Sequence, residues 1–333
     1  MAHITFSEAS GLQDSIYGKS QAPIQRFLEK RAEAFERESI AKVLFDMNKS
    51  KNYGEKLTGL TAMGDFQAVG ENGAYPLSGM QEGYSKTLEH VTWKNSFSLS
   101  REIMDDGKVL DLKKKPEQFV SAYYRTRENY AAALLGAALS GNNSIKFQGT
   151  TASTQGADGK RVFATDHPGK VSKKTYANAY SDAFSAEALG KLEVRMQNTE
   201  GDNGEILDIA PDTIIIPNDY ELKQAVFAAI GADKDPDSSN NGFNYLFGRW
   251  NVIVWPYLNR FITDGEKPWI LFDSAYNKQV GTNVWFDRVN LEVRATIDEN
   301  TDANVWRGYA RFVAGFNDWR GMYAGGITGG TAL

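Results

Sequence analysis

The stretch PEQFVSAYYRTRENYAAALLGAALSG, residues 116–141, carries the clearest helix signal in the sequence. Pro116 is tolerated in the first turn of a helix, where its missing N–H is not needed, and Gly141 is a typical helix stop. Aromatic and apolar side chains recur at helical spacing near one face: Phe119, Tyr123, Tyr130, Leu134 and Ala138. The stretch therefore predicts one long helix over about 116–140.

Shorter helices and strands alternate downstream of this helix. Ser185 is a typical N-cap for a helix over about 185–200, and TIIIP at 213–217 indicates a buried strand that Pro217 stops. A helix is predicted at 219–231. Further strand candidates are WNVIVWPYL (250–258), PWILFD (268–273), VNLEVRAT (289–296) and VWRGYARFVAGFNDWRGMYAG (305–325), the last two as antiparallel strands. The fold class is therefore predicted to be α+β.

The chain upstream of the long helix has a different character. Residues 1–22 lack periodicity, whereas 23–45 have apolar residues at helical spacing. Residues 50–84 are rich in glycine and too long for an ordinary loop, so we expect an extended two-stranded flap, with DFQAV (65–69) as one strand-like piece. HVTWKNSFSLS (90–100) alternates as a strand does, with a slip at Asn95.

Composition excludes several classes of protein. The net charge of −5 argues against general nucleic-acid binding driven by basic charge. The absence of cysteine excludes disulfides, thiolate metal sites and thiol nucleophiles. The N-terminal stretch has no secretory signal pattern, and no apolar run approaches the length of a membrane span, so we expect a product of the cytosol with no export address.

One histidine motif raises the question of catalysis. RVFATDHPGK, 161–170, places His167 between Asp166 and Pro168. Adjacency in sequence does not aim a carboxylate at the imidazole ring, and no G-x-S-x-G nucleophile elbow accompanies the motif. We expect a loop histidine that caps backbone groups, and a hydrolase using His167 remains the less favoured alternative.

No metal or cofactor site is expected from the sequence. The three histidines are far apart and lack metal-ligand spacing. DKDPDSS (233–239) begins like a calcium loop, but Ser238 and Asn244 stand where an EF-hand needs Gly and Glu. We expect a turn-rich acidic loop there, no cofactor, and no catalytic residue.

In three places the chain resembles the major capsid proteins of tailed bacteriophages with the HK97-type fold, and Mu-like head subunits in particular. FSLSREIMDDG (97–107) is similar to the passage that follows the family's extended E-loop. EVRMQNTEGDNGEILDIAPDTIIIPNDYE (193–221) resembles a helix, loop and strand of Mu-like subunits, and FATDHP (163–168) the loop before that helix. FGRWNVIVWPYL (247–258) and DSAYNKQVGTNVWFDRVNLEV (273–293) are similar to the family's later strands.

The resemblance implies an HK97-like organisation of the chain. It implies an N-terminal arm over 1–48 and an E-loop over 49–92. It further implies a P-domain over 93–195 and 285–320, with its spine helix at about 116–140, an A-domain over 196–284 and a C-terminal tail over 321–333.

The resemblance also implies a function and partners. The chain is expected to be a structural, non-enzymatic subunit that assembles with itself into pentamers, hexamers and a closed shell around double-stranded DNA. Scaffolding, portal and decoration proteins are further possible partners, and a membrane is not. The subunit is expected in the virion head after assembly in the bacterial host cytoplasm. Exposed aromatics of the E-loop, Phe66, Tyr75 and Tyr84, are the expected assembly contacts, and an encapsulin-like shell around protein cargo is the alternative.

Overall fold

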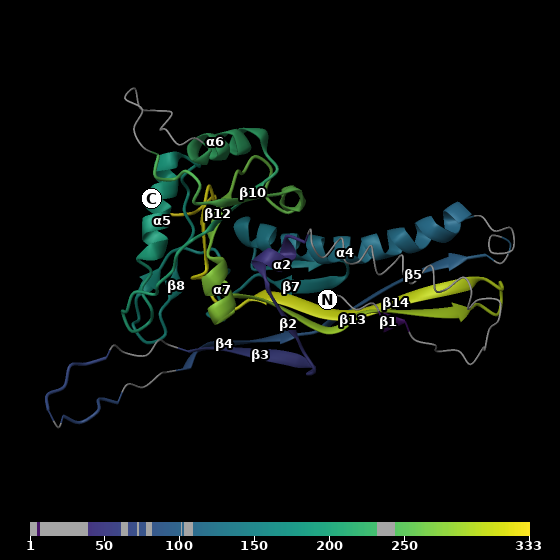
Figure 1. The fold of residues 1–333 in the computed structure, drawn as a ribbon, viewed down its shortest axis with the longest axis horizontal. Coiled ribbons are helices and arrows are strands. Elements are labelled where there is room, and N and C mark those ends of the chain that lie inside the picture. Colours follow the sequence, from purple (N-terminus) through teal and green to yellow (C-terminus); the bar gives the residue numbers. More distant parts are fainter. Residues whose placement is uncertain are drawn as a thin grey trace. The chain divides into compact units, whose positions relative to one another are not determined.

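The computed structural model describes residues 5–6, 39–60, 66–71, 73–77, 82–100, 102, 109–231 and 244–333 (Figure 1). The chain divides into two compact units. Unit 1 comprises Met1–Glu55, Glu89–Ala131 and Trp285–Ala314, and unit 2 comprises Lys56–Leu88, Ala132–Val284 and Gly315–Leu333. The predicted mixture of helices and strands is confirmed.

A five-stranded sheet forms the frame of unit 1. Its order is β1 (Thr5–Phe6), β13 (Asn283–Ile297), β14 (Asn304–Phe316) and β5 (Val91–Leu99), and β2 (Asp46–Lys49) also pairs with β13. β5 runs antiparallel to β14 in unbroken register, so the slip expected at Asn95 is not a bulge. Asn95 lies opposite Gly308, where an added Cβ would meet the Phe119 ring. The missing side chain at Gly308 makes room for a helix residue.

The long helix α4 spans Val109–Leu139, and its residues 109–131 belong to unit 1. The prediction that Pro116 lies in the first turn is wrong, because Pro116 lies inside the helix. Proline there cannot donate its backbone hydrogen bond to the preceding turn. Packing after Pro116 offsets that loss: Phe119, Val120 and Tyr124 are buried against Leu99, Leu291, Val293 and Trp306 of the sheet.

Aromatic rings fill the space between α4 and the sheet. Phe97 stacks on Trp306 with ring centroids 5.1 Å apart, and Phe119 of α4 lies at 5.1 Å from Phe97. Further along, Trp93 and Trp285 both stack on Phe312, each at 5.0 Å. The inward positions of β5 are therefore the odd-numbered ones that the alternating pattern predicts.

Arg127 lies within this aromatic layer and joins α4 to β13. Its guanidinium donates two hydrogen bonds to the Asp287 carboxylate, at 2.7 and 2.9 Å, and a third to Tyr123 Oη at 3.1 Å. It also lies 4.6 Å from the Trp285 ring centroid. Burial alone lowers the pKa of Arg127, but Tyr123 and Asp287 outweigh burial and raise it. Arg127 and Asp287 thus form an ion pair that joins α4 to β13 and is surrounded by aromatic rings; we name it the Arg127–Asp287 clamp.

A four-stranded sheet in the order β11–β10–β12–β15 forms the core of unit 2. The bounds are β11 (Asn251–Trp255), β10 (Thr213–Pro217), β12 (Trp269–Phe272) and β15 (Met322–Gly325). Every residue of β10 is buried, as TIIIP predicts. Residues 321–333, expected to form a tail, contribute β15, which pairs antiparallel with β12.

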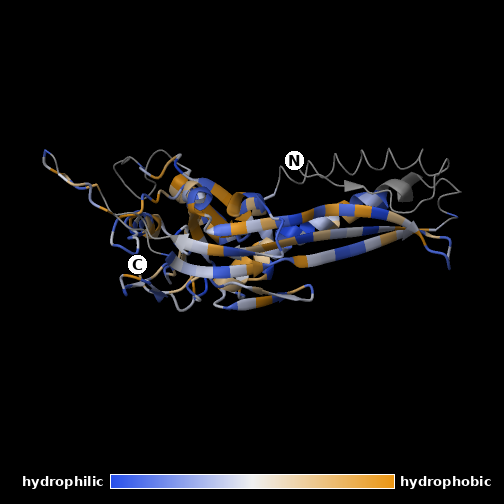
Figure 2. Cartoon of the chain, turned by 90° about the horizontal axis from the view of Figure 1, so that it is seen from below, coloured by the Kyte–Doolittle hydropathy of each residue, from blue (hydrophilic) through white to orange (hydrophobic). Residues whose placement is uncertain are grey.

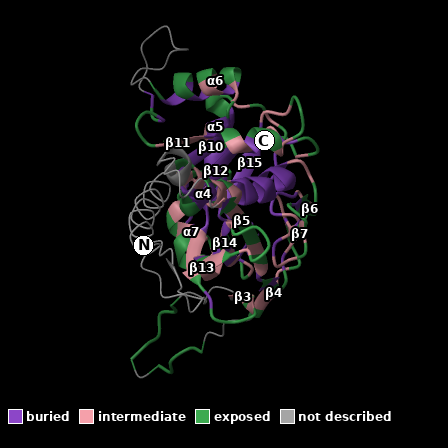
Figure 3. Ribbon diagram, turned by 90° about the vertical axis from the view of Figure 1, so that its right-hand side faces the viewer, coloured by how far each residue is buried: buried purple, intermediate pink, exposed green. Residues whose placement is uncertain are grey.

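Three helices and one 3-10 turn accompany this sheet: α5 (Ala186–Gln197), α6 (Tyr220–Ile230), α7 (Ser274–Val280) and η1 (Pro256–Arg260). Ser185 caps α5 by accepting from the backbone N–H of Ala188, as predicted. Asp219 and Asp273 cap α6 and α7 in the same way. The C-terminal part of α4 is buried (Figure 3).

The flap consists of the paired strands β3 (Gly54–Leu60) and β4 (Glu82–Glu89). The prediction of a strand at DFQAV is wrong for residues 66–69, which form no strand; Asp65 lies outside the described residues. The described residues also contain the hairpin β6 (Ser144–Phe147) and β7 (Thr150–Ser153), the pair β8 (His167–Pro168) and β9 (Thr175–Tyr176), and the short helix α2 (Ala41–Leu44). Most of the helix predicted at 23–45 also lies outside the described residues.

We predict that Arg127→Met lowers the free energy of unfolding by about 2 kcal/mol, because it removes two charge-assisted hydrogen bonds from the half-buried Asp287 carboxylate. The double variant R127M/D287N should cost at least about 1 kcal/mol less than the sum of the single variants. Urea unfolding followed by tryptophan fluorescence measures both quantities. Arg307→Met, an exposed change on β14, should stay within about 0.5 kcal/mol, and additive costs at 127 and 287 would contradict the clamp.

Candidate functional site

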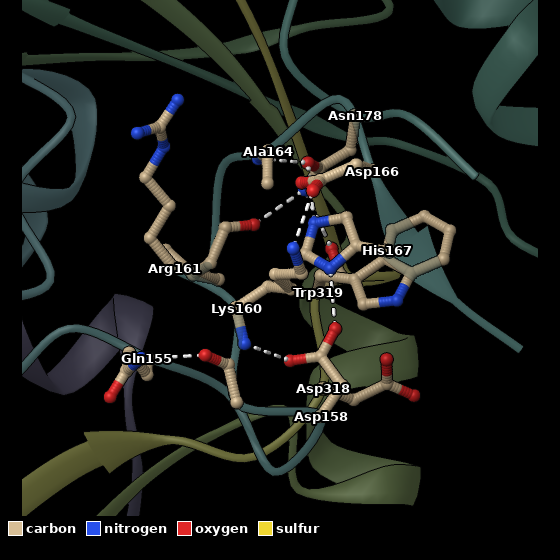
Figure 4. Close-up of polar contacts among 12 residues, drawn as sticks. Gln155, Asp158, Lys160, Arg161, Ala164, Asp166, His167, Asn178, Asp318 and Trp319 are labelled. Atoms are coloured by element: carbon tan, nitrogen blue, oxygen red, sulfur yellow. Dashed lines mark hydrogen bonds and ion pairs between the residues drawn. The ribbon is translucent and has the colours of Figure 1, made fainter. Parts of the chain in front are cut away.

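The buried histidine of the RVFATDHPGK motif is fully enclosed in unit 2. His167 begins β8 and has no solvent exposure. Its ring stacks on Trp319, with centroids 4.6 Å apart (Figure 4). Nδ1 lies 2.6 Å from Asp158 Oδ2, and Nε2 lies 3.0 Å from Asn178 Oδ1. The expectation of a loop histidine that caps backbone groups is wrong, since its partners are two buried side chains.

The orientation of the Asn178 amide fixes the role of Nε2. Asn178 Nδ2 donates to the carbonyl oxygens of Val162 and Met322, at 2.7 and 2.9 Å. Its Oδ1 accepts from the backbone N–H of Ala164. Oδ1 is therefore also the acceptor for His167, so Nε2 carries a proton and donates. With Nδ1 engaged by Asp158, neither ring nitrogen is available as a general base.

Asp166 takes no part in this network. Its carboxylate pairs with Lys160 Nζ at the surface, and the hydrogen bond from Lys160 lowers the pKa of Asp166. The carboxylate of Asp166 therefore does not face the imidazole of His167, which confirms that adjacency in sequence does not bring the two groups together. The carboxylate that contacts the imidazole belongs to Asp158. Asp158 lies outside the RVFATDHPGK motif, and no known spacing of catalytic residues points to it.

A second histidine contacts a serine in unit 1. His90 Nε2 lies 2.8 Å from Ser50 Oγ, and that hydroxyl donates in turn to Glu55. Burial lowers the pKa of His90, and the positive charges of Arg288 and Arg311 lower it further. Because Ser50 and His90 are both buried, the pair cannot reach a substrate and holds the start of the flap.

Within the described part of the chain, no group of acidic or histidine side chains is arranged to hold a metal ion. The DKDPDSS loop at 233–239 lies outside the described residues. None of the described helices has the length and apolarity that crossing a bilayer requires.

Two lysines of unit 2 fix the base of the flap. Lys170 Nζ donates to the carbonyl oxygens of Glu82 and Gly83, both at 2.8 Å, and lies 5.8 Å from the centroid of the Tyr84 ring. Lys86, on β4, donates to the carbonyl oxygen of Gln155. Burial lowers the pKa of Lys86 to about 8, with Asp158 partly opposing the shift. Sequence reasoning missed both lysines, since neither carries a local signal.

The segment between β3 and β4, described at residues 66–71 and 73–77 and named here the distal flap, is more exposed than the paired strands at its base. Phe66 and Tyr75, two of the expected assembly contacts, are essentially fully exposed, and so is Leu77, which the sequence analysis missed. Tyr84 is half-buried at the base beside Lys170. The role of all three expected contacts in assembly stays a prediction.

A family model described as phage capsid protein matches residues 83–325. The chain belongs to the phage capsid protein family. It is therefore a structural subunit of a phage head, and the family match supports the head over an encapsulin-like compartment. No curated protein matches the chain.

Solved capsid structures share the fold at low sequence identity. The capsid of Ralstonia phage GP4 is 8% identical, with a TM-score of 0.50, over 84% of this chain and 86% of that chain. The head of Helicobacter pylori bacteriophage KHP40 is 8% identical, with a TM-score of 0.50, over 84% of this chain and 87% of that chain. The chain has the HK97-type fold that the sequence resemblance implied.

We predict that His167→Ala lowers the free energy of unfolding by about 3 kcal/mol, because it removes the hydrogen bonds of the imidazole to Asp158 and Asn178 and opens a cavity against Trp319. Denaturant unfolding measures the change. Asp166→Asn, one residue away and exposed, is the matched control and should stay within about 0.5 kcal/mol. Equal costs for the two variants would contradict the assignment.

The lowered pKa of Lys86 predicts that the stability of the folded protein depends on pH. Its pKa falls from 10.5 to about 8 on folding, so the unfolded state binds more protons between these values. Raising the pH through this window therefore stabilises the folded state, and below pH 8 the full penalty remains. The free energy of unfolding of the unmodified protein should rise with pH, from about 8 to 10.5, relative to Lys86→Met. Lys146→Met controls for the loss of a lysine; parallel curves for the unmodified protein and K86M would contradict the prediction.

Proposed function

We propose that the chain is the major head subunit, which assembles into pentamers and hexamers and closes around double-stranded DNA without reading its sequence. Assembly takes place in the bacterial host cytoplasm and the product is the virion head. The single observation that carries this proposal is the distal flap, whose large apolar side chains the folded chain leaves uncovered.

The exposed side chains of the flap favour association with further copies. Phe66, Tyr75 and Leu77 are each essentially fully exposed and lie close together in the sequence, which is unusual for large apolar side chains. Burying each side chain contributes about 1.5–3 kcal/mol, which must exceed the cost of ordering the flap. A contact repeated around every ring of subunits makes that gain cooperative.

The division of the chain follows the family plan in this proposal. The N-terminal arm covers 1–48, the E-loop 49–92, the P-domain 93–195 with 285–320, and the A-domain 196–284. The flap strands β3 and β4 fall within the E-loop. Residues 321–333 close the chain, and α4 serves as the spine helix.

Catalysis has no part in the proposed role. Both nitrogens of His167 are occupied, and the Ser50–His90 pair is buried. The net charge of −5 suits a shell that contains packaged DNA, because a negatively charged inner surface does not bind the DNA phosphates tightly. Scaffolding, portal and decoration proteins are the further partners proposed.

Negative-stain electron microscopy with light scattering tests the proposal. The purified chain, alone or co-expressed with scaffolding protein, should give pentamer and hexamer rings or closed icosahedral particles. The variant F66S/Y75S/L77S should stay folded but unassembled, whereas Ile206→Ser, an exposed apolar control outside the flap, should assemble. A chain that remains monomeric under both conditions would contradict the shell function.

A further inference from the structure

A hydrogen bond joins two residues of unit 1, Ser50 and His90, that lie shortly before β3 and directly after β4 in the sequence. The backbone N–H of His90 donates to the carbonyl oxygen of Tyr53, and the backbone N–H of Ser50 donates to that of Asp287 on β13. We name Ser50, His90 and Glu55 the histidine pin, because together they fasten the start of β3 to the start of β5.

The hydrogen bonds of Ser50 fix the position of the proton on His90. The hydroxyl oxygen of Ser50 lies 2.5 Å from the Glu55 carboxylate and 3.5 Å from the carbonyl oxygen of Asn52, so its one proton goes to Glu55. The same oxygen accepts from the backbone N–H of Asn52 at 3.2 Å and from His90 Nε2 at 2.8 Å. Nε2 therefore carries a proton, and Nδ1 of the neutral ring is a bare acceptor.

Two arginines lie on the face of the sheet that is turned away from α4. Asp287 and Phe312 contact α4, so their neighbours Arg288 on β13 and Arg311 on β14 point the other way. Figure 2 shows this alternation of hydrophobic and hydrophilic residues along the long strands of the sheet. Both arginines lie near enough to His90 to act on its charge.

The surroundings of Nδ1 suit a neutral ring. His90 Nδ1, Arg288 Nη1 and Arg311 Nε are buried and have no hydrogen-bond partner among the described residues. Burial and the two arginines lower the pKa of His90, while the carboxylates of Glu55 and Asp287 oppose the shift. A bare Nδ1 is compatible with N–H donors around it. A protonated Nδ1 would add a third donor and a third positive charge beside two guanidinium groups.

We propose that the histidine pin is an acid-sensitive device: the neutral imidazole fastens the start of β3 to the start of β5, and protonation of Nδ1 releases them. The groups that act on the ring are Glu55 of β3, Asp287 and Arg288 of β13, and Arg311 of β14. The device belongs to the single folded subunit and does not depend on the proposed shell function.

The direction of the response follows from the lowered pKa. The opened pin exposes a histidine of ordinary pKa, 6.5, whereas the closed pin resists the proton to lower pH. Below pH 6.5 the opened form therefore binds more protons than the closed form does, and acid shifts the balance towards opening. Above this value both forms are neutral, so the pin keeps its full strength.

The other histidine of the described residues is arranged differently. His167 Nδ1 lies 2.6 Å from a carboxylate oxygen of Asp158, so a proton on that nitrogen has an acceptor. His90 Nδ1 has none among the described residues. The acid response is therefore specific to the pin in unit 1.

Hydrogen–deuterium exchange of the unassembled full-length chain tests the proposal, with rates corrected for the intrinsic effect of pH. Between about pH 7.5 and about pH 6.0, we expect the protection of amides in residues 50–55 and 90–92 to fall by about two- to fourfold. His90→Gln is the matched variant, because the glutamine amide still donates to Ser50 Oγ but does not titrate. Its protection should stay the same at both pH values. Equal falls in the two proteins, or no fall in either, would overturn the proposal.

NMR of isotope-labelled histidine gives a second readout that does not require the H90Q variant to fold, and the chain has only three histidines to assign. We expect His90 as the neutral Nε2–H form at about pH 7.5, with a titration midpoint below 6.5. Arg311→Met should raise this midpoint, whereas Arg307→Met, further along the same strand, should leave it unchanged. A proton on Nδ1 at about pH 7.5, or a midpoint at or above 6.5, overturns the proposal.

Discussion

The ion pair between Arg127 and Asp287 is the interaction on which unit 1 depends. It joins the middle of α4 to β13, and the rings of Tyr123, Trp285 and Phe312 surround the guanidinium. Trp285 Nε1 donates to the same carboxylate, and the backbone carbonyl of Asp287 accepts from Ser50. One residue pair therefore sets the register of helix, sheet and the start of the flap. Removing either charge leaves the other half-buried without its ion-pair partner, so the pair favours this one arrangement of α4 on β13.

Unit 2 has a polar centre of its own. Asn178 receives or donates five hydrogen bonds that join the 162–167 segment to the backbone around Trp319 and Met322. His167 extends this network to Asp158, in the loop whose Gln155 carbonyl accepts from Lys86 of the flap. A motif that resembles catalytic machinery in the sequence thus stabilises the region that fixes the flap base. A shell subunit needs such rigidity, because a contact repeated in many copies multiplies small errors in angle.

Local signals made much of the fold predictable. TIIIP predicted a buried strand because an apolar run bounded by proline fits little else, and Ser185 predicted a helix start because its hydroxyl caps a free backbone N–H. The same reasoning failed at Pro116, where packing of the following turns overrides a local preference. It failed again at residues 66–69, whose β-like composition pairs with no strand among the described residues.

The hydrogen-bond network around His167 and the contacts at the base of the flap were harder to predict, because they join residues that are distant in sequence. Nothing around Asp158 or Asn178 indicates that both meet His167, and no spacing rule places Lys170 beneath Glu82. The exposed aromatics of the flap were predictable, since a glycine-rich segment has no core in which to bury them.

Hydrogen–deuterium exchange of the unassembled chain and of assembled particles tests the central claim, that the flap is completed by another copy. Amides of residues 66–77 should exchange freely in the unassembled chain and become protected in particles, while β10 stays protected in both. Equal exchange of residues 66–77 in the two states would contradict the account, because assembly would then leave the flap uncovered.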